Sequence, residues 1–140
     1  MKNIILILFM LIISCSTGPQ PLMVGKDECF YCKMPVAEKK FGAEIITEKG
    51  KCYKFDDVGC MINFMKYNFS TNEKAKNILT VNYADHQQFL NVNDCVFLKS
   101  VVLHSPMNSG IAAFESTNEV QRFLREFPGS VLSWNQLQAN

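Results

Sequence analysis

The sequence predicts an α+β domain in which two similar halves share one sheet. In the first half, a loop with Met34-Pro35 leads into predicted strands that end at Phe55-Asp56-Asp57, where a helix begins. In the second half, Pro106-Met107 leads into residues 111–115 and another helix. Each half reads as methionine loop, strand and helix, and two such units around one sheet form an α+β domain. The repeat would also bring the two methionine loops close together.

The first half begins with a predicted β-hairpin. Residues 43–47 and 51–55 flank the turn 48–50, which ends in a glycine. Asp56 and Asp57 then suit the positive N-terminal end of a helix. The apolar stripe of that helix recurs at helical spacing and consists of Val58, Met61, Ile62 and Met65.

Polar residues 70–77 are predicted to form a loop after the first helix. Residues 78–83 and 94–104 read as strands. Residues 116–119 form a capping box, and Pro128-Gly129 ends the helix that follows. Its apolar stripe consists of Val120, Phe123, Leu124 and Phe127, and residues 131–134 form a final predicted strand.

The N-terminus is typical of a bacterial lipoprotein. Residues 1–14 carry one charge, Lys2, and an apolar run of roughly ten residues, too short for a membrane span of about 20. Residues 12–15 fit a lipobox, so we expect cleavage before Cys15 and fatty acylation of that cysteine. We therefore predict a signal peptide (1–14), a lipidated tether (15–24) and one folded domain (25–140).

Charge gives no indication of a nucleic-acid partner. Without Lys2, the 14 basic and 13 acidic residues of the chain become 13 of each, for a net charge of zero. Nucleic-acid-binding domains are usually strongly basic.

Five cysteines remain after Cys15, and an odd number is unusual in an exported domain. They are Cys29, Cys32, Cys52, Cys60 and Cys95. A complete set of disulfides is excluded, so at least one thiol stays free. We expect the last three to be small apolar residues in or near the core. Lone histidines, His86 and His104, have no partner motif.

The candidate metal-binding motif of the chain is the stretch Cys29-Phe-Tyr-Cys32-Lys-Met34-Pro35. Pro35 favours an extended Met34, and alternation in an extended segment would put Cys32 and Met34 on one side. Cys29 would need a turn to join them. A thiolate beside a thioether favours Cu(I), because thioethers are poor zinc ligands.

Three other interpretations remain open for this motif. A thioredoxin-type redox pair would place its first cysteine at a helix start, whereas here a proline and a charged loop follow. A structural zinc site could recruit Cys52 and Cys60, although eight residues separate them. A disulfide between Cys29 and Cys32 would close a short, strained loop.

The chain resembles the NosL family of lipoprotein copper chaperones, which assist assembly of nitrous oxide reductase. The resemblance rests on the lipobox ending at Cys15 and on four stretches in the family's order: CFYCKM (29–34), FDDVGCM (55–61), SPMNSGIAAF (105–114) and GSVLSW (129–134). It implies a fold of two ββα-type units sharing one mixed or antiparallel sheet. Asn108 departs from the family pattern, in which a glycine more often follows the methionine.

The resemblance also implies a function and a ligand set. It implies a protein that binds Cu(I) and is tethered to a bacterial envelope membrane, with the periplasmic side expected. The copper would pass to the multi-copper reductase of denitrification or to its ABC-type assembly machinery, with no enzymatic step. The implied ligands are Cys32, Met34 and Met107. Family members differ in whether the first cysteine is present, so Cys29 is a fourth candidate.

Overall fold

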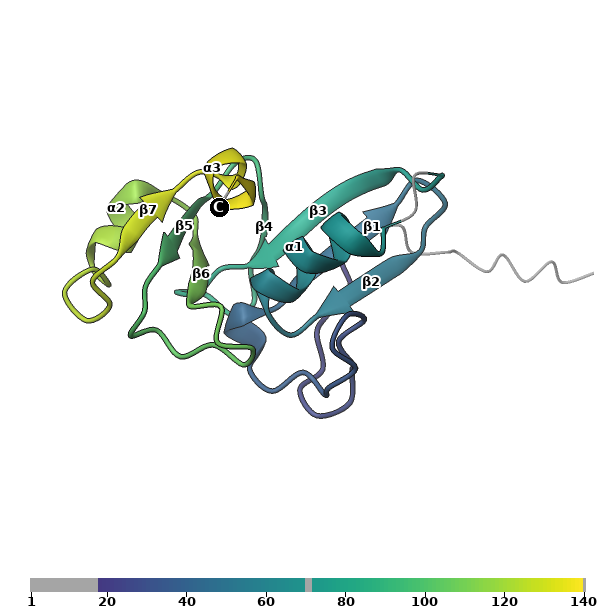
Figure 1. Ribbon diagram of the computed structural model, residues 1–140, viewed down its shortest axis with the longest axis horizontal. Helices are drawn as coiled ribbons and strands as arrows, with labels where there is room; N and C mark the ends of the chain where they lie inside the picture. Colours follow the sequence, from purple (N-terminus) through teal and green to yellow (C-terminus); the bar gives the residue numbers. More distant parts are fainter. Residues whose placement is uncertain (1–17, 70–71, 140) are drawn as a thin grey trace, which may run out of the picture.

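The computed structural model describes residues 18–69 and 72–139 and contains two antiparallel sheets (Figure 1). The larger sheet has the order β2-β1-β3-β4 and consists of β1 (Ala43–Thr47), β2 (Cys52–Phe55), β3 (Ala75–Val81) and β4 (Phe89–Asn91). The smaller has the order β6-β5-β7 and consists of β5 (Val96–Lys99), β6 (Ile111–Phe114) and β7 (Ser130–Leu132). The helices are η1 (Lys39–Phe41, a 3₁₀ turn), α1 (Val58–Tyr67), α2 (Thr117–Gln121) and α3 (Trp134–Gln138).

The predicted α+β class is confirmed, but the prediction of one shared sheet is wrong. β4 turns back along the outer edge of β3, so that edge is occupied and β5 starts a separate sheet. The two sheets meet at one parallel bridge between Asn82 and Ala113. There the N–H of Tyr83 donates to the carbonyl of Ala113 at 2.8 Å.

The two ββα units are present and have the same topology. Each consists of a hairpin, a helix, and a third strand that pairs with the first: β1-β2-α1-β3 and β5-β6-α2-β7. Ala43 pairs with Phe55 in one hairpin, and Val96 pairs with Phe114 in the other. The methionine loops are not equivalent, because Met34 precedes the first hairpin whereas Met107 lies between the strands of the second.

Most predicted elements of the first unit form where expected. The hairpin spans the predicted strands, and Asp57 is the N-cap of α1, with its carboxylate accepting a hydrogen bond from the Gly59 N–H at 2.6 Å. Val58 and Met61 of the predicted stripe are fully buried, whereas Ile62 and Met65 are partly buried.

The second unit departs from prediction at three places. The strand predicted for 94–104 ends at Lys99, because Ser100 leaves the sheet and its hydroxyl donates to the Pro128 carbonyl at 2.6 Å. The regular part of α2 is short, and residues 122–127 continue as turns. Trp134 begins α3 instead of ending a strand, because Ser133 and Gln136 form a capping box.

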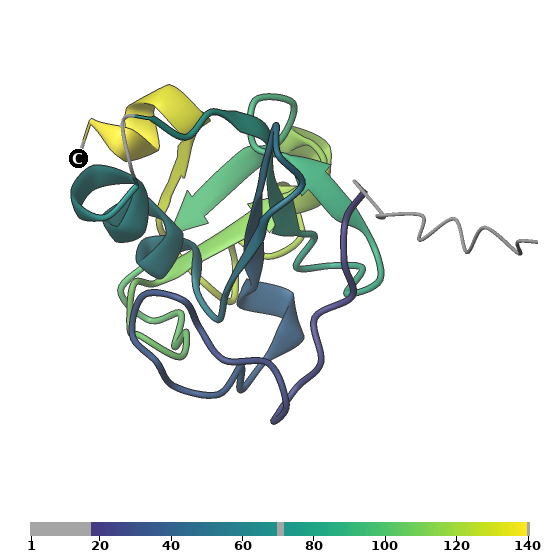
Figure 2. The same cartoon turned by 90° about the vertical axis from the view of Figure 1, so that its right-hand side faces the viewer.

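The two larger apolar clusters of the described residues form most of the core. The larger lies between α1, both sheets and α3, and includes Phe55, Phe64, Phe97 and Trp134. In Figure 2, α1 and α3 lie side by side. The smaller cluster, which includes Leu98, Phe114 and Val120, belongs to the second unit. The first cluster therefore buries one side of α1 and fixes this helix on its sheet.

The described chain already contacts the domain before residue 25. The N–H of Gln20 donates to Oε2 of Glu44 at 3.0 Å, and Leu22 is buried against Val36 and Val81. The predicted signal peptide and Cys15 lie outside the described residues. Within the described ranges, no helix has the length and apolar character needed to span a membrane.

Candidate metal centre

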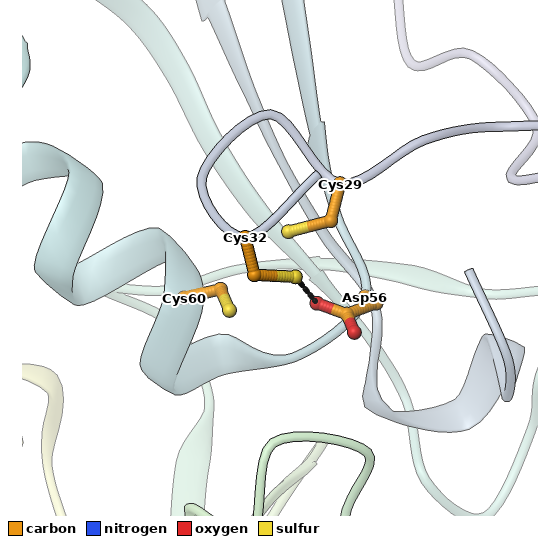
Figure 3. Close-up of side chains that lie close together, drawn as sticks. All are labelled: Cys29, Cys32, Asp56 and Cys60. Carbon is orange, nitrogen blue, oxygen red and sulfur yellow. Dashed lines mark hydrogen bonds between the residues drawn. The ribbon is translucent and has the colours of Figure 1, made fainter. Parts of the chain in front are cut away.

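Three thiols and one carboxylate gather where the first unit begins its helix (Figure 3). Cys29 and Cys32 come from the loop before β1, Asp56 from the link between β2 and α1, and Cys60 from the first turn of α1. One ligand atom from each residue lies within 4.8 Å of the other three. No other group of this kind occurs in the described part of the chain. The arrangement has the size and donor types of a metal site.

A tight turn brings Cys29 and Cys32 together. The Lys33 N–H donates to the Cys29 carbonyl at 3.0 Å, and the Cys29 N–H donates to the Met34 carbonyl at 2.8 Å. Lys33 has a left-handed backbone with φ of 64°. The sequence-based expectation of an extended segment from Cys32 to Met34 is therefore wrong, because alternation does not pass through a left-handed residue.

Because of this turn, the predicted ligands differ in how far they are exposed to solvent. Cys29 is fully buried and Cys32 is partly buried, whereas Met34 is 43% exposed. The structure thus groups Cys32 with Cys29, Asp56 and Cys60.

Asp56 is a buried carboxylate that faces the thiols. The Cys32 thiol donates to its Oδ1 at 3.7 Å, while its Oδ2 is buried without a hydrogen-bond partner among the described residues. Burial and then contact with Cys29 raise the pKa of Asp56 to about 7. A buried carboxylate oxygen without a partner is costly, and a bound cation would relieve that cost.

Asp56 and Cys60 are the site residues that the predicted copper ligand set lacked, although Cys60 was considered as a ligand of the alternative zinc site. Cys60 was assigned to the core, and it does contact the larger apolar cluster, but its thiol also faces Cys29 and Cys32. The predicted helix start at Asp57 could have indicated that Cys60 lies near the site. With Asp57 as the N-cap of α1, Cys60 falls in the first helical turn, only four residues after Asp56.

The three thiols of the cluster differ in the direction of their pKa shifts. A hydrogen bond from the Cys60 thiol, helped by the backbone amides of Cys32 and Asp56, lowers the pKa of Cys29 to about 4 against the effect of burial. The same bond, together with burial, raises the pKa of Cys60. Burial, with the nearby charges of Cys29 and Asp56, raises the pKa of Cys32 to about 11. A cation that recruits these sulfurs as ligands displaces their protons.

The second methionine loop packs against the same end of α1. The Met107 N–H donates to Oδ2 of Asp57 at 3.2 Å, so one buried carboxylate caps the helix and holds the loop. A Cβ on Gly59 would lie 2.7 Å from the Cβ of Ser109, so only glycine permits this approach. Met107 itself is 39% exposed.

The backbone conformation at Asn108 accounts for a glycine or an asparagine at this position. Its φ is 55°, a left-handed conformation that glycine adopts freely and that asparagine tolerates better than most residues. The loop therefore keeps a glycine-like backbone with asparagine in place.

The remaining cysteines and histidines lie outside the cluster. Cys95 is buried and its thiol donates to the Val92 carbonyl at 3.8 Å, while Cys52 is partly buried on β2. All five described cysteines are free, so the predicted alternative of a Cys29–Cys32 disulfide is not formed. His86 contacts the Tyr83 carbonyl, and His104 is exposed.

Comparison with known proteins identifies the family and the fold. The family model of NosL matches residues 21–140. No curated protein matches the chain. Among solved structures, the copper chaperone NosL from Shewanella denitrificans has the same fold, with a TM-score of 0.71 and 14% sequence identity over 86% of this chain and 95% of that chain. The chain therefore belongs to the NosL family.

Proposed function

We propose that this protein is a metallochaperone whose cargo is Cu(I), held by Cys29, Cys32 and Cys60 beside Asp56. The observation that carries the proposal is the cluster of three thiols and one carboxylate within 4.8 Å. Membership of the NosL family supports copper as the cargo. Binding and release require no covalent step, so the protein acts as a carrier.

The donor types favour Cu(I). Soft thiolates select Cu(I), for which three sulfur ligands complete a coordination shell, while a carboxylate is a harder donor. Asp56 then has a supporting role. It accepts a hydrogen bond from the Cys32 thiol in the metal-free site, and its charge attracts the cation.

The exposed thioethers of Met34 and Met107 suit entry and release of the cargo. Both side chains reach solvent, and both backbones are hydrogen-bonded to residues of the site or its helix cap. Methionine carries no proton and binds Cu(I) without competition from acid. The predicted ligands Met34 and Met107 therefore remain part of the proposal, as ligands that exchange with a partner.

A structural zinc site is the second candidate, because three thiolates and a carboxylate also suit tetrahedral Zn²⁺. A thiol oxidoreductase is disfavoured by burial. Cys29 is the only member of the cluster whose pKa is lowered, yet it is 0% exposed, so a substrate disulfide cannot reach its sulfur.

Competition titration with a Cu(I) chelator tests the binding proposal. We expect a 1:1 complex whose affinity falls strongly in Cys32→Ser and Cys60→Ser and less in Met107→Leu. Cys52→Ser is the matched control, because Cys52 is a free, partly buried thiol outside the cluster. Full affinity in Cys32→Ser and Cys60→Ser would overturn the proposal.

A thermal melt separates copper carriage from structural zinc. A structural zinc domain unfolds when a chelator removes its metal, whereas a carrier folds with or without cargo. We expect the protein to keep a cooperative unfolding transition after a chelator has removed its metal, whereas loss of that transition would favour structural zinc.

The cellular setting is proposed from the sequence. We propose lipidation at Cys15, attachment to a bacterial envelope membrane on its periplasmic side, and delivery of copper to nitrous oxide reductase or to its ABC-type assembly machinery. In cells, Cys15→Ala should move the protein from the membrane fraction to the soluble fraction and abolish palmitate labelling. The copper-loaded chain should restore copper to metal-free nitrous oxide reductase, and Cys32→Ser should not.

A further inference from the structure

An open groove lies beside the turn that carries Cys29 and Cys32. Its volume is about 600 Å³, and it is lined by Phe30, Tyr31, Lys33, Tyr53, Phe64 and Asn68. Phe30 and Tyr31 are the two residues between the two cysteines, and they are 39% and 36% exposed. Any molecule in this groove would therefore touch the metal-binding turn.

The floor of the groove is aromatic and already formed. The ring centroids of Phe30 and Tyr53 are 4.5 Å apart, and those of Phe30 and Phe64 are 5.5 Å apart, both edge to face. The Phe30 N–H also donates to the Lys54 carbonyl at 2.8 Å, which ties the turn to β2. A floor fixed in this way needs little ordering when a partner binds.

The rim of the groove is cationic. The Lys33 ammonium lies 4.2 Å from the centroid of the Phe30 ring, and the Lys51 ammonium lies 4.3 Å from that of Tyr53. Glu73, which accepts a hydrogen bond from the Tyr53 hydroxyl, lies 3.8 Å from Lys51 and offsets one of the two charges. The groove thus combines aromatic rings with positive charge at its edge, although the whole chain is almost neutral.

We propose that this groove docks an acidic segment bearing an apolar side chain, presented by the protein that receives the metal. This inference rests on the proposed carrier function. Apolar burial on the aromatic floor would supply affinity, and the lysines would select carboxylates and speed encounter. A concave groove fits a protruding peptide segment better than a flat bilayer surface. Docking here places the acceptor against the turn between two cargo ligands.

The test uses the full chain and two labelled peptides, one of alternating glutamate and leucine and one of alternating lysine and leucine. We expect fluorescence anisotropy to detect the acidic peptide only, with affinity falling as salt rises. Amide resonances of Phe30, Tyr53 and Asn68 should shift on binding. Equal binding of both peptides, or shifts elsewhere on the surface, would overturn the proposal. Binding to phosphatidylglycerol vesicles but not to the peptide would overturn it in favour of a membrane surface.

A matched pair of charge reversals locates the effect. Lys51 and Lys49 lie in the same turn, but only Lys51 contacts the groove aromatics. We expect Lys51→Glu to weaken the acidic peptide about fivefold or more and Lys49→Glu to leave it nearly unchanged. Equal effects of the two reversals would contradict docking in the groove.

Cu(I) titration of the same samples distinguishes the two proposals. If the wild-type chain binds the acidic peptide in the groove but does not bind Cu(I), the carrier proposal is wrong and the docking proposal stands. If the chain binds Cu(I) but no acidic peptide, only the docking proposal is wrong.

Discussion

The two ββα units have one topology but different helix N-termini. The register of the hairpins makes Phe55-Asp56-Asp57 equivalent to Phe114-Glu115-Ser116, and it makes Cys60 equivalent to Glu119. In the first unit Asp56 and Asp57 are buried, whereas in the second Glu115 and Ser116 are exposed. Glu119 closes a local cap by accepting the Glu115 N–H, while Cys60 joins the thiol cluster. The two units thus share a topology, but only the first has a thiol cluster, because the loop with Cys29 and Cys32 packs against the start of α1.

The largest difference between the units should appear in metal binding. Cys60→Ser removes one of three proposed thiolate ligands, and we expect Cu(I) affinity to fall by more than the roughly 10–100-fold that loss of an outer-shell partner costs. Glu119→Gln at the equivalent position should leave the affinity unchanged. Chelator competition measures both, and similar affinities for the two variants would remove the distinction between the units.

Loss of the N-cap should cost more in the first unit. Ser116→Ala removes a cap and should lower the free energy of unfolding by about 1 kcal/mol. Asp57→Ala removes a cap and also leaves the Met107 N–H without its acceptor, for a total of about 2–3 kcal/mol. Urea unfolding of the metal-free protein measures both changes. Equal losses would show that Asp57 does not hold the methionine loop.

Alanine should have opposite effects at the second position of the two helices. Asn118→Ala is on an exposed surface and should stabilise the protein by a few tenths of a kcal/mol, about the difference in helix propensity. Gly59→Ala forces a Cβ against Ser109, and we expect a net loss of about 1–2 kcal/mol. Recovery of part of that loss in the double variant Gly59→Ala/Ser109→Gly would identify the contact as the cause. Stabilisation by Gly59→Ala would contradict it.

The smallest expected difference concerns pH and the first strands. Glu44 of β1 is buried, whereas Phe97 is its equivalent in β5. Burial raises the pKa of Glu44 to about 7 from an ordinary value of 4.5, despite the Gln20 N–H. The folded state therefore holds this proton more tightly than the unfolded state, and stability falls as pH rises from about 4.5 to 7.

Glu44→Gln should remove the part of that fall that comes from Glu44, while the part from Asp56 remains. Between pH 4.5 and 7, the change in unfolding free energy should become smaller by about 1 kcal/mol, after allowance for solvent screening. Urea unfolding across this pH range is the measurement. Parallel pH profiles for wild type and variant would show that Glu44 titrates normally in the folded protein.

Local sequence signals predicted much of the fold. The hairpin around Gly50, the Asp57 cap and the Ser116 cap all follow from residues close in sequence, and all are confirmed. The division into two sheets could not be predicted in this way. It depends on β4 occupying the edge of β3, a pairing between segments that local propensity does not specify.

The candidate site was predicted only in part for a similar reason. The sequence indicated a soft-metal motif at Cys29, Cys32 and Met34, but the left-handed Lys33 changed the expected partners. Cys60 lies far along the chain, and its approach depends on how α1 packs under the loop. The assignment of Met34 and Met107 as ligands stays a prediction.

X-ray absorption at the copper edge reports directly on the ligands of the bound ion. For the 1:1 Cu(I) complex of the full chain, we expect a first shell of three sulfur atoms. In Cys60→Ser this shell should fall to two sulfur atoms, and in Cys52→Ser it should not change. A sulfur shell that is identical in wild type and Cys60→Ser would contradict a cargo site built on the first turn of α1.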